Sequence, residues 1–333
     1  MNRRKNLITR RLITWFQNHG RHDLPWRQSP TPYDVLVSEF MLQQTTVATI
    51  TPRFYTWMQR FPDIKALAKA EEHEVLSAWQ GLGYYARARR LHAAAKAIVA
   101  QHQGIIPANL TTLMELPGIG RYTASALMAF AFDQPVEVLD TNIIRVVARL
   151  NNITTAIDTA SGRRHLEEVA LTMLPKKEGR SFASALMDLG SMICIATTPK
   201  CDICPLSELC QAENPSSLPQ KKPRAVVTKK KEQRAFYQRD NTLYLEQSTG
   251  PLWKGLWILP SYTRPPKQKE FITSIIYPIT RYRITMQLYR PAGLVPKNLK
   301  PFSLDELEHL AIPSPHRKAI KLGYQRHHNR QKE

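Results

Sequence analysis

The chain has only four cysteines, and all of them fall in one short segment: Cys194, Cys201, Cys204 and Cys210, spaced C-x6-C-x2-C-x5-C. Thiols gathered once, in one loop, favour a metal site over a framework of disulfides. Two evenly spaced pairs would indicate zinc, whereas this uneven spacing is more typical of the ligands of a [4Fe–4S] cluster. On spacing alone, zinc or another structural metal is the alternative.

A carboxylate, Glu39, falls within a helix that should begin at Thr31-Pro32-Tyr33-Asp34. That segment supplies a cap residue, a proline for the first turn and an early acidic residue. The neighbours of Glu39 at helical spacing are apolar, so its carboxyl group would be partly desolvated. Desolvation disfavours the anion, and a carboxyl group that keeps its proton can deliver it as a general acid. A buried glutamate paired with an arginine is the structural alternative.

The segment Leu116-Pro117-Gly118-Ile119-Gly120 lies between two expected helices. Its glycines allow a tight turn, and the following helix offers free N–H groups to an anion. With Arg121 directly after, it has the features of a helix-hairpin-helix that holds a DNA phosphate; an ordinary glycine-rich connector is the alternative.

Asp140 stands before another expected helix, where most aspartates act only as an N-cap. A carboxylate at a helix start is also kept ionised, which suits the stabilisation of a developing cation.

The patterns along the chain predict two domains. From about residue 7 to 210 the patterns are helical, and a Pro-, Ser- and Lys-rich stretch follows. After it come strand-like runs, of which the clearest is 282–289. A helix should then start at the capping-box pair Ser303 and Glu306. We therefore expect a helical domain over 1–212 with a metal loop at 194–210, a basic linker over 213–233 and a small α+β domain over 234–333. The expected helices of the first domain are 31–47, 71–80, 86–102, 111–116, 121–132, 142–150, 163–174 and 181–194.

The charge balance points to a polyanionic partner. Lysine and arginine number 47 against 27 acidic residues, a formal net charge of +20. Nucleic acid is the commonest such partner, with a solvated basic surface or anionic lipid as alternatives. No apolar run approaches the ~18 residues of a membrane span, and the basic start of the chain is too broken for a signal peptide. Free cysteines without an export signal imply the cytoplasm, where DNA binding would bring the chain to the nucleoid.

Several segments occur in the order of a known family: Val37–Thr45, Gly81–Ala88, Leu116–Ala124, Leu139-Asp140 and the four cysteines. Over roughly 7–212 the chain resembles the MutY-type adenine DNA glycosylases of the endonuclease III superfamily. The resemblance implies a mainly α, two-lobed helix-hairpin-helix glycosylase with an iron–sulfur loop, followed by a NUDIX-like domain. It also implies a [4Fe–4S] cluster and double-stranded DNA with a mispaired adenine as the partner. A monomer is the default expectation.

The resemblance implies roles for the catalytic residues. Glu39 would protonate adenine at N7, Asp140 would stabilise the oxocarbenium-like sugar, and Asn142 would support Asp140. Tyr122 stands where strand-cleaving relatives have a lysine. Because a phenol cannot form the Schiff base of a lyase, we expect a monofunctional glycosylase.

The resemblance also implies which residues contact DNA. Gln44 and Thr45 would wedge beside the base opposite the target, and Tyr84 would intercalate, with Leu82 in the same loop. The expected phosphate contacts are Gly118, Gly120, Arg121 and Lys200. The expected walls of the adenine pocket are Trp26, Arg27 and Ser184.

Three departures from the family concern specificity. Thr141 replaces the usual glycine after the catalytic aspartate, and Ser184 replaces a glutamine or glutamate that contacts the adenine edge. The third lies in the C-terminal domain, where the segment 252–260 resembles the family's 8-oxoguanine-reading domain, but the Phe-Ser-His loop is absent near 278–282. We therefore expect a reduced preference for 8-oxoguanine over guanine. No complete NUDIX motif is present, so no nucleotide hydrolysis is expected.

Three alternatives to a monofunctional adenine glycosylase stay open. A glycosylase of the same fold could remove another mispaired base, such as thymine opposite guanine. A bifunctional lyase is disfavoured by Tyr122. A non-catalytic protein that binds damaged DNA and holds a structural zinc is disfavoured by the presence of both Glu39 and Asp140.

Overall fold

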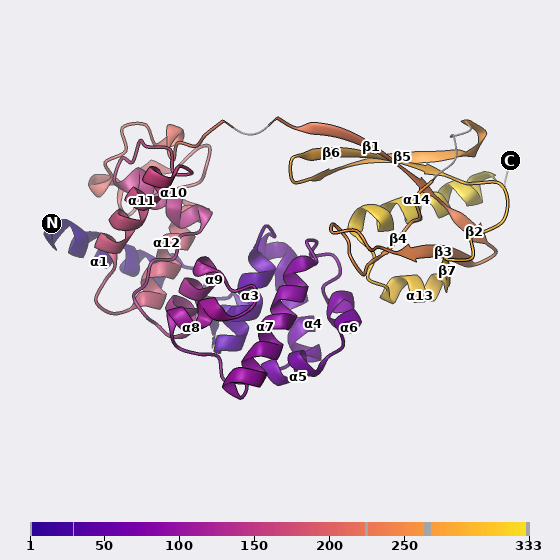
Figure 1. Ribbon diagram of the computed structural model, residues 1–333. Coiled ribbons are helices and arrows are strands. Elements are labelled where there is room, and N and C mark those ends of the chain that lie inside the picture. The colour runs from indigo at the N-terminus through magenta and orange to yellow at the C-terminus, as the bar shows by residue number, and fades with distance from the viewer. Residues whose placement is uncertain (1, 29, 224–225, 263–267, 331–333) are drawn as a thin grey trace. The chain divides into compact units, whose positions relative to one another are not determined.

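The computed structural model describes the chain except for residues 1, 29, 224–225, 263–267 and 331–333 (Figure 1). It divides into two compact units. The first combines Met1–Ala70 with Arg89–Pro223, and the second combines Glu71–Ala88 with Arg224–Glu333. The segment 71–88, expected to belong to the helical domain, therefore clusters with the C-terminal strands.

The first unit is built of helices, as expected from the sequence (Figure 1). Its α-helices are α1 (Asn2–His19), α2 (Pro25–Gln28), α3 (Pro32–Leu42), α4 (Val47–Arg60), α5 (Ile64–Lys69), most of α7 (Ala86–His102), α8 (Leu110–Glu115), α9 (Arg121–Ala126), α10 (Thr141–Leu150), α11 (Ala160–Met173) and α12 (Gly179–Met192). A π-helix, Leu127–Ala131, continues α9. Short 3-10 turns at Cys201–Ile203, Ser207–Leu209 and Pro215–Ser217 follow α12.

The caps of two helices confirm the sequence-based starts. Thr31 and Asp34 form a capping box at the start of α3. Asp140 caps α10, its side chain accepting a hydrogen bond from the Ile143 N–H. The expected helix over 31–47, however, ends at Leu42, because Gln44 has a positive φ of 58° that interrupts the helical backbone, and Thr46 then caps α4.

One hydrophobic core of the first unit lies where α10 and α12 pack against each other and against α1, α11 and the π-helix Leu127–Ala131. One face of α10 presents Val146, Val147 and Leu150 to this core, and α12 presents Ala185 and Leu189. Close approach is possible at Gly190 of α12, because a Cβ there would meet the Cβ of Asn142 at 2.8 Å. The packing therefore fixes the start of α10 against α12.

The second unit contains a three-stranded sheet in the order β1-β6-β5 and strands β2, β3, β4 and β7, with β3 paired to each of the other three. The strands are β1 (Thr228–Ala235), β2 (Tyr237–Arg239), β3 (Thr242–Gln247), β4 (Trp257–Ile258), β5 (Phe271–Ile279), β6 (Tyr282–Tyr289) and β7 (Lys300–Ser303). The helices are α6 (Glu72–Ala78), α13 (Leu304–His309) and α14 (Ser314–Arg330), and α14 packs against β5. The capping box of Ser303 and Glu306 starts α13, as expected.

The linker expected over 213–233 is shorter in the structure. Residues up to Pro223 belong to the first unit, where the Lys222 N–H donates to Asp158 Oδ1 at 3.0 Å. From Thr228 the chain is already a strand, because β1 pairs in parallel with β6. Among the described residues, no helix is long and apolar enough to cross a membrane.

Candidate active site

Glu39 lies on the buried face of α3 and is 4% exposed. The Tyr122 hydroxyl donates a hydrogen bond to its Oε2 at 2.8 Å. Burial raises the pKa of Glu39 to about 7, and the charge of Asp140 adds to the rise, while the Tyr122 hydrogen bond and the charge of Arg27 oppose it. The carboxyl group can therefore hold a proton near neutral pH, as a general acid must.

Two cavities meet at Glu39. The first, with about 710 Å³ of empty volume, extends toward α12 and is lined by Ser184, Arg180 and Phe130. The second, with about 1180 Å³, is lined by Tyr122 and Asp140. The side chain of Glu39 is thus shared between an aromatic-walled pocket and a more open groove that contains a second carboxylate.

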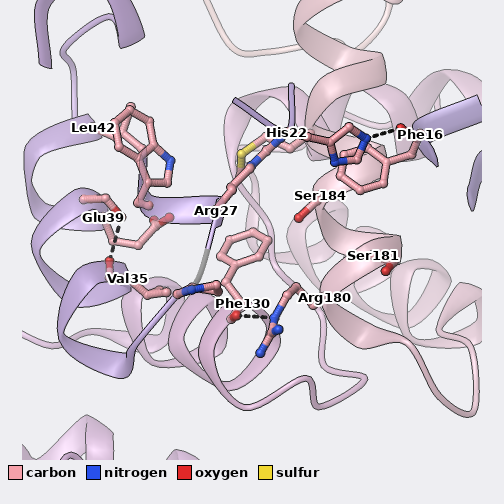
Figure 2. Close-up of a pocket in the computed structure, with 14 residues that line it drawn as sticks. Phe16, His22, Arg27, Val35, Glu39, Leu42, Phe130, Arg180, Ser181 and Ser184 are labelled. Atoms are coloured by element: carbon pink, nitrogen blue, oxygen red, sulfur yellow. Dashed lines mark hydrogen bonds between the residues drawn. The ribbon is translucent and has the colours of Figure 1, made fainter. Parts of the chain in front are cut away.

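The first cavity combines aromatic side chains with a few polar groups, a lining that is typical of ligand pockets. Figure 2 shows Glu39 and Ser184 on opposite sides, with Arg27 and Phe130 between them. Trp26 and Arg27 line both cavities. The three residues expected from the sequence to wall the base pocket, Trp26, Arg27 and Ser184, are therefore brought together with Glu39.

Arg27 is held in place by Asp188, a fully buried carboxylate of α12. Asp188 accepts hydrogen bonds from Arg27 at 2.8 and 3.1 Å, and from the Arg21 backbone and side chain. Burial alone would raise the pKa of Asp188, but the bonds from the two arginines lower it below its ordinary value. Asp188 is therefore ionised, and it fixes the charge of Arg27 at the pocket wall.

Asp140 is oriented at the start of α10. Its Oδ1 accepts from the Ile143 N–H at 2.6 Å, and its Oδ2 accepts from Asn142 Nδ2 at 3.0 Å. Asn142 is in turn fixed by Arg145, whose Nη2 donates to Asn142 Oδ1 at 2.9 Å. Asp140 thus lines the open groove with two donors on its carboxyl group, and one of them is Asn142, the residue that the resemblance places beside it.

The same arginine connects Asn142 to the cysteine loop. Arg145 Nε donates to the Cys194 carbonyl at 2.7 Å, and Arg145 Nη2 donates to the Gly190 carbonyl at 2.5 Å. Arg149, one turn further along α10, donates to the carbonyls of Ile195 and Ala196, both at 2.7 Å. Two arginines of α10 therefore hold the beginning of the loop that follows α12.

The four cysteines line one cavity, with about 630 Å³ of empty volume, together with Arg149 and Lys200. Arg149 Nη1 lies 3.4 Å from Cys194 Sγ. Burial raises the pKa of Cys204 to about 11, and the neighbouring thiols add to this rise. Four thiols that line one cavity beside a buried cation fit the donor set of a metal cluster, which would replace their protons on binding.

Comparisons with known proteins agree with this geometry. Residues 37–170 match the model of the HhH-GPD superfamily base excision DNA repair proteins, and residues 194–210 match the iron–sulfur binding domain of endonuclease III. The adenine DNA glycosylase of Mycolicibacterium smegmatis is 44% identical over 59% of this chain and 66% of its own length. That of Buchnera aphidicola subsp. Schizaphis graminum is 33% identical over 78% of this chain and 76% of its own length.

The chain belongs to the adenine DNA glycosylase family. Its fold agrees, because a solved thermostable thymine-DNA glycosylase matches it with a TM-score of 0.58 and 28% identity, over 63% of this chain and 96% of that one. The [4Fe–4S] cluster expected from the cysteine spacing is also supported, since the iron–sulfur match runs from the first cysteine to the last.

The residues expected to contact DNA fall into different environments. Gln44 is exposed with a positive φ, and Thr45 lines the open groove beside it. A non-glycine residue held at positive φ is strained, and such strain is often found at functional sites. Tyr84, in the second unit, shares this feature, with a φ of 46° and 50% exposure, whereas Leu82 is only 5% exposed. Leu82 therefore lies beneath its loop in this conformation.

The phosphate-binding candidates are at the surface. Gly118 and Gly120 are exposed between α8 and α9, and Gly118 has a φ of 76°, so the turn needs glycine there. Lys200 is exposed in the cysteine loop. The guanidinium of Arg121 forms an ion pair with Glu137, and the Arg121 side chain is also exposed to solvent.

Some residues of the site are not among those expected from the sequence: Arg21, Phe130, Arg145, Arg149, Arg180 and Asp188. One signal pointed to Asp188, because it is the single charged residue within the apolar run from Phe182 to Ile193. A carboxylate in such a run needs a buried partner. The sequence does not indicate which arginines supply it.

Proposed function

We propose that this protein is a monofunctional DNA glycosylase that hydrolyses the N-glycosidic bond of adenine mispaired with guanine or 8-oxoguanine. The observation that carries the proposal is Glu39, a protonatable carboxyl group placed between an aromatic-walled pocket and a groove that holds Asp140. Double-stranded DNA is the proposed partner, the protein acting as a monomer in the cytoplasm.

The proposed reaction begins with extrusion of adenine from the duplex into the first cavity. Glu39 transfers its proton to N7 of the base, and the C1′–N9 bond breaks with its electron pair passing to adenine. The deoxyribose ring becomes cationic, and the carboxylate of Asp140, oriented by Asn142 and the α10 backbone, stabilises it electrostatically. A water molecule then attacks C1′ and gives its proton to Glu39, which restores the acid.

Tyr122 supports the monofunctional assignment. Its hydroxyl donates to Glu39, so it serves the acid rather than the sugar. A phenol cannot form an imine with C1′, and strand cleavage through a Schiff base is therefore not expected from this position.

The second unit is the proposed reader of the opposite base, as a divergent NUDIX-like domain. The β5–β6 hairpin turns at Thr280, which has a positive φ of 51°, and this is where the family's Phe-Ser-His loop is missing. We propose that adenine opposite guanine and adenine opposite 8-oxoguanine are cleaved with a smaller difference in rate than is usual for the family.

Removal of thymine opposite guanine is the alternative function. It is favoured by the structural match to a thymine-DNA glycosylase and by Ser184, whose short side chain replaces a longer polar one in the pocket. The altered pocket wall affects which base is held, and both reactions would use the same pair of carboxyl groups.

The test is single-turnover base release from duplexes that place adenine opposite guanine, 8-oxoguanine or cytosine, with thymine opposite guanine alongside. Glu39→Gln should abolish release, and Glu115→Gln, a change of an exposed carboxylate, should not. Release of adenine from the first two duplexes supports the proposal, and release of thymine alone supports the alternative. Tight binding without release of any base would identify a non-catalytic binder.

A further inference from the structure

The loop between α6 and α7 presents one aromatic ring to solvent. Three residues in it have positive φ, Gly81, Gly83 and Tyr84, and the Tyr84 side chain is 50% exposed. A bulky residue in the left-handed region is disfavoured, so surrounding contacts must hold the loop in this shape.

Part of that support comes from within the loop. Arg87, which is 5% exposed, donates to the carbonyls of Leu82 at 2.8 Å and Gly83 at 3.1 Å. The indole of Trp79 donates to the same Gly83 carbonyl at 3.1 Å. The guanidinium of Arg87 also lies over the Tyr84 ring, 5.9 Å from its centroid. These contacts fix the backbone that directly precedes the exposed ring.

The rest of the support comes from the last residue of α13 and the chain that leads from it to α14. Four successive carbonyls there each accept a hydrogen bond, and two of the donors come from the segment 71–88. Ser77 Oγ donates to the His309 carbonyl at 2.8 Å, and Tyr85 Oη donates to the Ile312 carbonyl at 3.4 Å. The carbonyls between these two accept from Arg317 Nη2 and from the Trp257 N–H.

Arg317, in the first turns of α14, joins the two segments directly. With its amide oxygen toward the guanidinium, Gln80 accepts from Arg317 Nη2 at 2.5 Å and from Nε at 2.8 Å. The same guanidinium donates to the Leu310 carbonyl at 2.8 Å. Gln80 directly precedes the three positive-φ residues, so Arg317 fixes the point at which the loop begins.

We propose that the segment His309–Arg317 is a positioning element for the Tyr84 loop, with Arg317 as its key positioning residue. The inference rests on the proposed function, together with the role that the family resemblance implies for Tyr84, whose ring would enter the base stack while adenine is extruded. The C-terminal strand domain then contributes to base extrusion itself, in addition to any contact with the opposite base. Loss of Arg317 should impair extrusion more than it impairs DNA binding.

The test uses the full-length, cluster-containing protein with Glu39→Gln, so that no base is cleaved. The probe is a duplex with 2-aminopurine in place of the mispaired adenine, because its fluorescence rises when it leaves the stack. Arg317→Met keeps the aliphatic stem and removes the guanidinium, and Lys318→Met removes the same charge from an exposed neighbour. We expect Arg317→Met to reduce the extrusion equilibrium about tenfold with nearly unchanged affinity for the duplex, and Lys318→Met to change neither.

Three outcomes would overturn the inference: normal extrusion in Arg317→Met, equal losses in Arg317→Met and Lys318→Met, or loss of affinity without loss of extrusion. If Arg317→Met fails to fold, Ser77→Ala combined with Tyr85→Phe removes the other two contacts and should lower extrusion in the same way. Tyr84→Ala separates the two proposals. If it extrudes the base normally, the wedge role itself is wrong; if it loses extrusion while the Arg317 and Ser77/Tyr85 variants do not, only the positioning inference fails.

Discussion

At the scale of single residues, the raised pKa of Glu39 links activity to a cost in stability. A group whose pKa is higher in the folded chain than in the unfolded chain favours folding at low pH and loses that contribution as the pH rises. For Glu39 the change runs from its ordinary 4.5 to about 7. Below pH 4.5 the burial of Glu39 therefore costs the folded protein no stability. Above about pH 7 the full cost of burying the ionised carboxylate lowers the free energy of unfolding.

Glu39→Gln should stabilise the protein in alkaline solution. The amide carries no charge to desolvate, and its oxygen can still accept the Tyr122 hydrogen bond. We expect the free energy of unfolding to rise by as much as about 3 kcal/mol at about pH 8 and to change little at about pH 4. Urea unfolding at the two pH values measures this. A variant equally stabilised at both would contradict the raised pKa.

Tyr122→Phe should shift the pH dependence of the reaction. The Tyr122 hydrogen bond lowers the pKa of Glu39, so its removal raises that pKa further. The rate of a general acid declines once the pH exceeds its pKa, and the alkaline decline should therefore move to higher pH. Single-turnover rates from about pH 5 to about pH 9 would show the shift.

Tyr33→Phe is the matched control for this change. Tyr33 is another buried tyrosine, and its hydroxyl bonds to the Phe61 carbonyl rather than to Glu39. Its profile should keep the position of the wild type, whatever its effect on stability. A shift in both variants would mean that the profile reports folding and not the acid.

Much of the site could be predicted from the sequence at this scale. Glu39 stands out because its helical neighbours are apolar, and Asp140 because it precedes a helix. Asp188 and Arg27 could not be paired in advance, because their contact spans 161 positions of the chain. Only the packing of α12 against the α1–α2 region places that carboxylate beside the pocket.

At the scale of elements, α10 connects the groove that contains Asp140 to the iron–sulfur loop. Asp140 caps its first turn, and Arg145 bonds both to Asn142 and to the Cys194 carbonyl. Arg149 donates to the carbonyls of Ile195 and Ala196 in the same loop, and within the part of the chain that the structure describes no hydrogen bond joins it to Asn142. The two arginines therefore allow the support of Asp140 to be separated from the support of the loop.

Arg145→Lys should slow base release about tenfold per cluster-containing molecule, because an ammonium cannot replace the fork that fixes Asn142. Arg149→Lys, the control, should lower the amount of bound cluster, measured by visible absorbance, and leave the rate per cluster unchanged. If the two variants release base at equal rates per bound cluster, Arg145 acts only through the cysteine loop.

Elements were predictable where local chemistry defines them. Residues close together in the sequence form the start of α3, the cap of α10 and the capping box of α13. The strand β1 was not predicted, because a run of three lysines, Lys229 to Lys231, is typical of an exposed linker. Its strand geometry comes from parallel pairing with β6, more than fifty positions away, as Lys229 opposite Arg283 illustrates.

At the scale of the whole molecule, the division into units was the least predictable feature. The segment 71–88 carries a helical motif, yet its contacts join it to residues 309–317. Two of these contacts are backbone carbonyls that accept from side chains, and a third joins the side chains of Gln80 and Arg317. Such long-range contacts leave no pattern in the sequence. The net charge of +20, in contrast, is a property of composition and already indicates a polyanionic partner.

The distribution of that charge gives a final prediction, for the salt dependence of DNA binding. Lys229, Lys231 and Arg283 are exposed, and the register of β1 and β6 places them on one face of the sheet. Each phosphate contact contributes about 0.9 to the slope of log affinity against log salt. If this face binds the DNA backbone, changing Lys229 and Arg283 to Gln should reduce the slope by about 2.

The matched control changes Lys65 and Lys69 to Gln, which removes the same charge from the exposed side of α5. Binding of Glu39→Gln protein to a duplex with adenine opposite guanine, titrated over a range of salt, measures both slopes without cleavage. A slope that falls only in the sheet variant assigns backbone contacts to that face, because long-range attraction to the net charge would decline equally in both. A slope that falls only in the α5 variant would contradict the prediction and assign them to the helical unit.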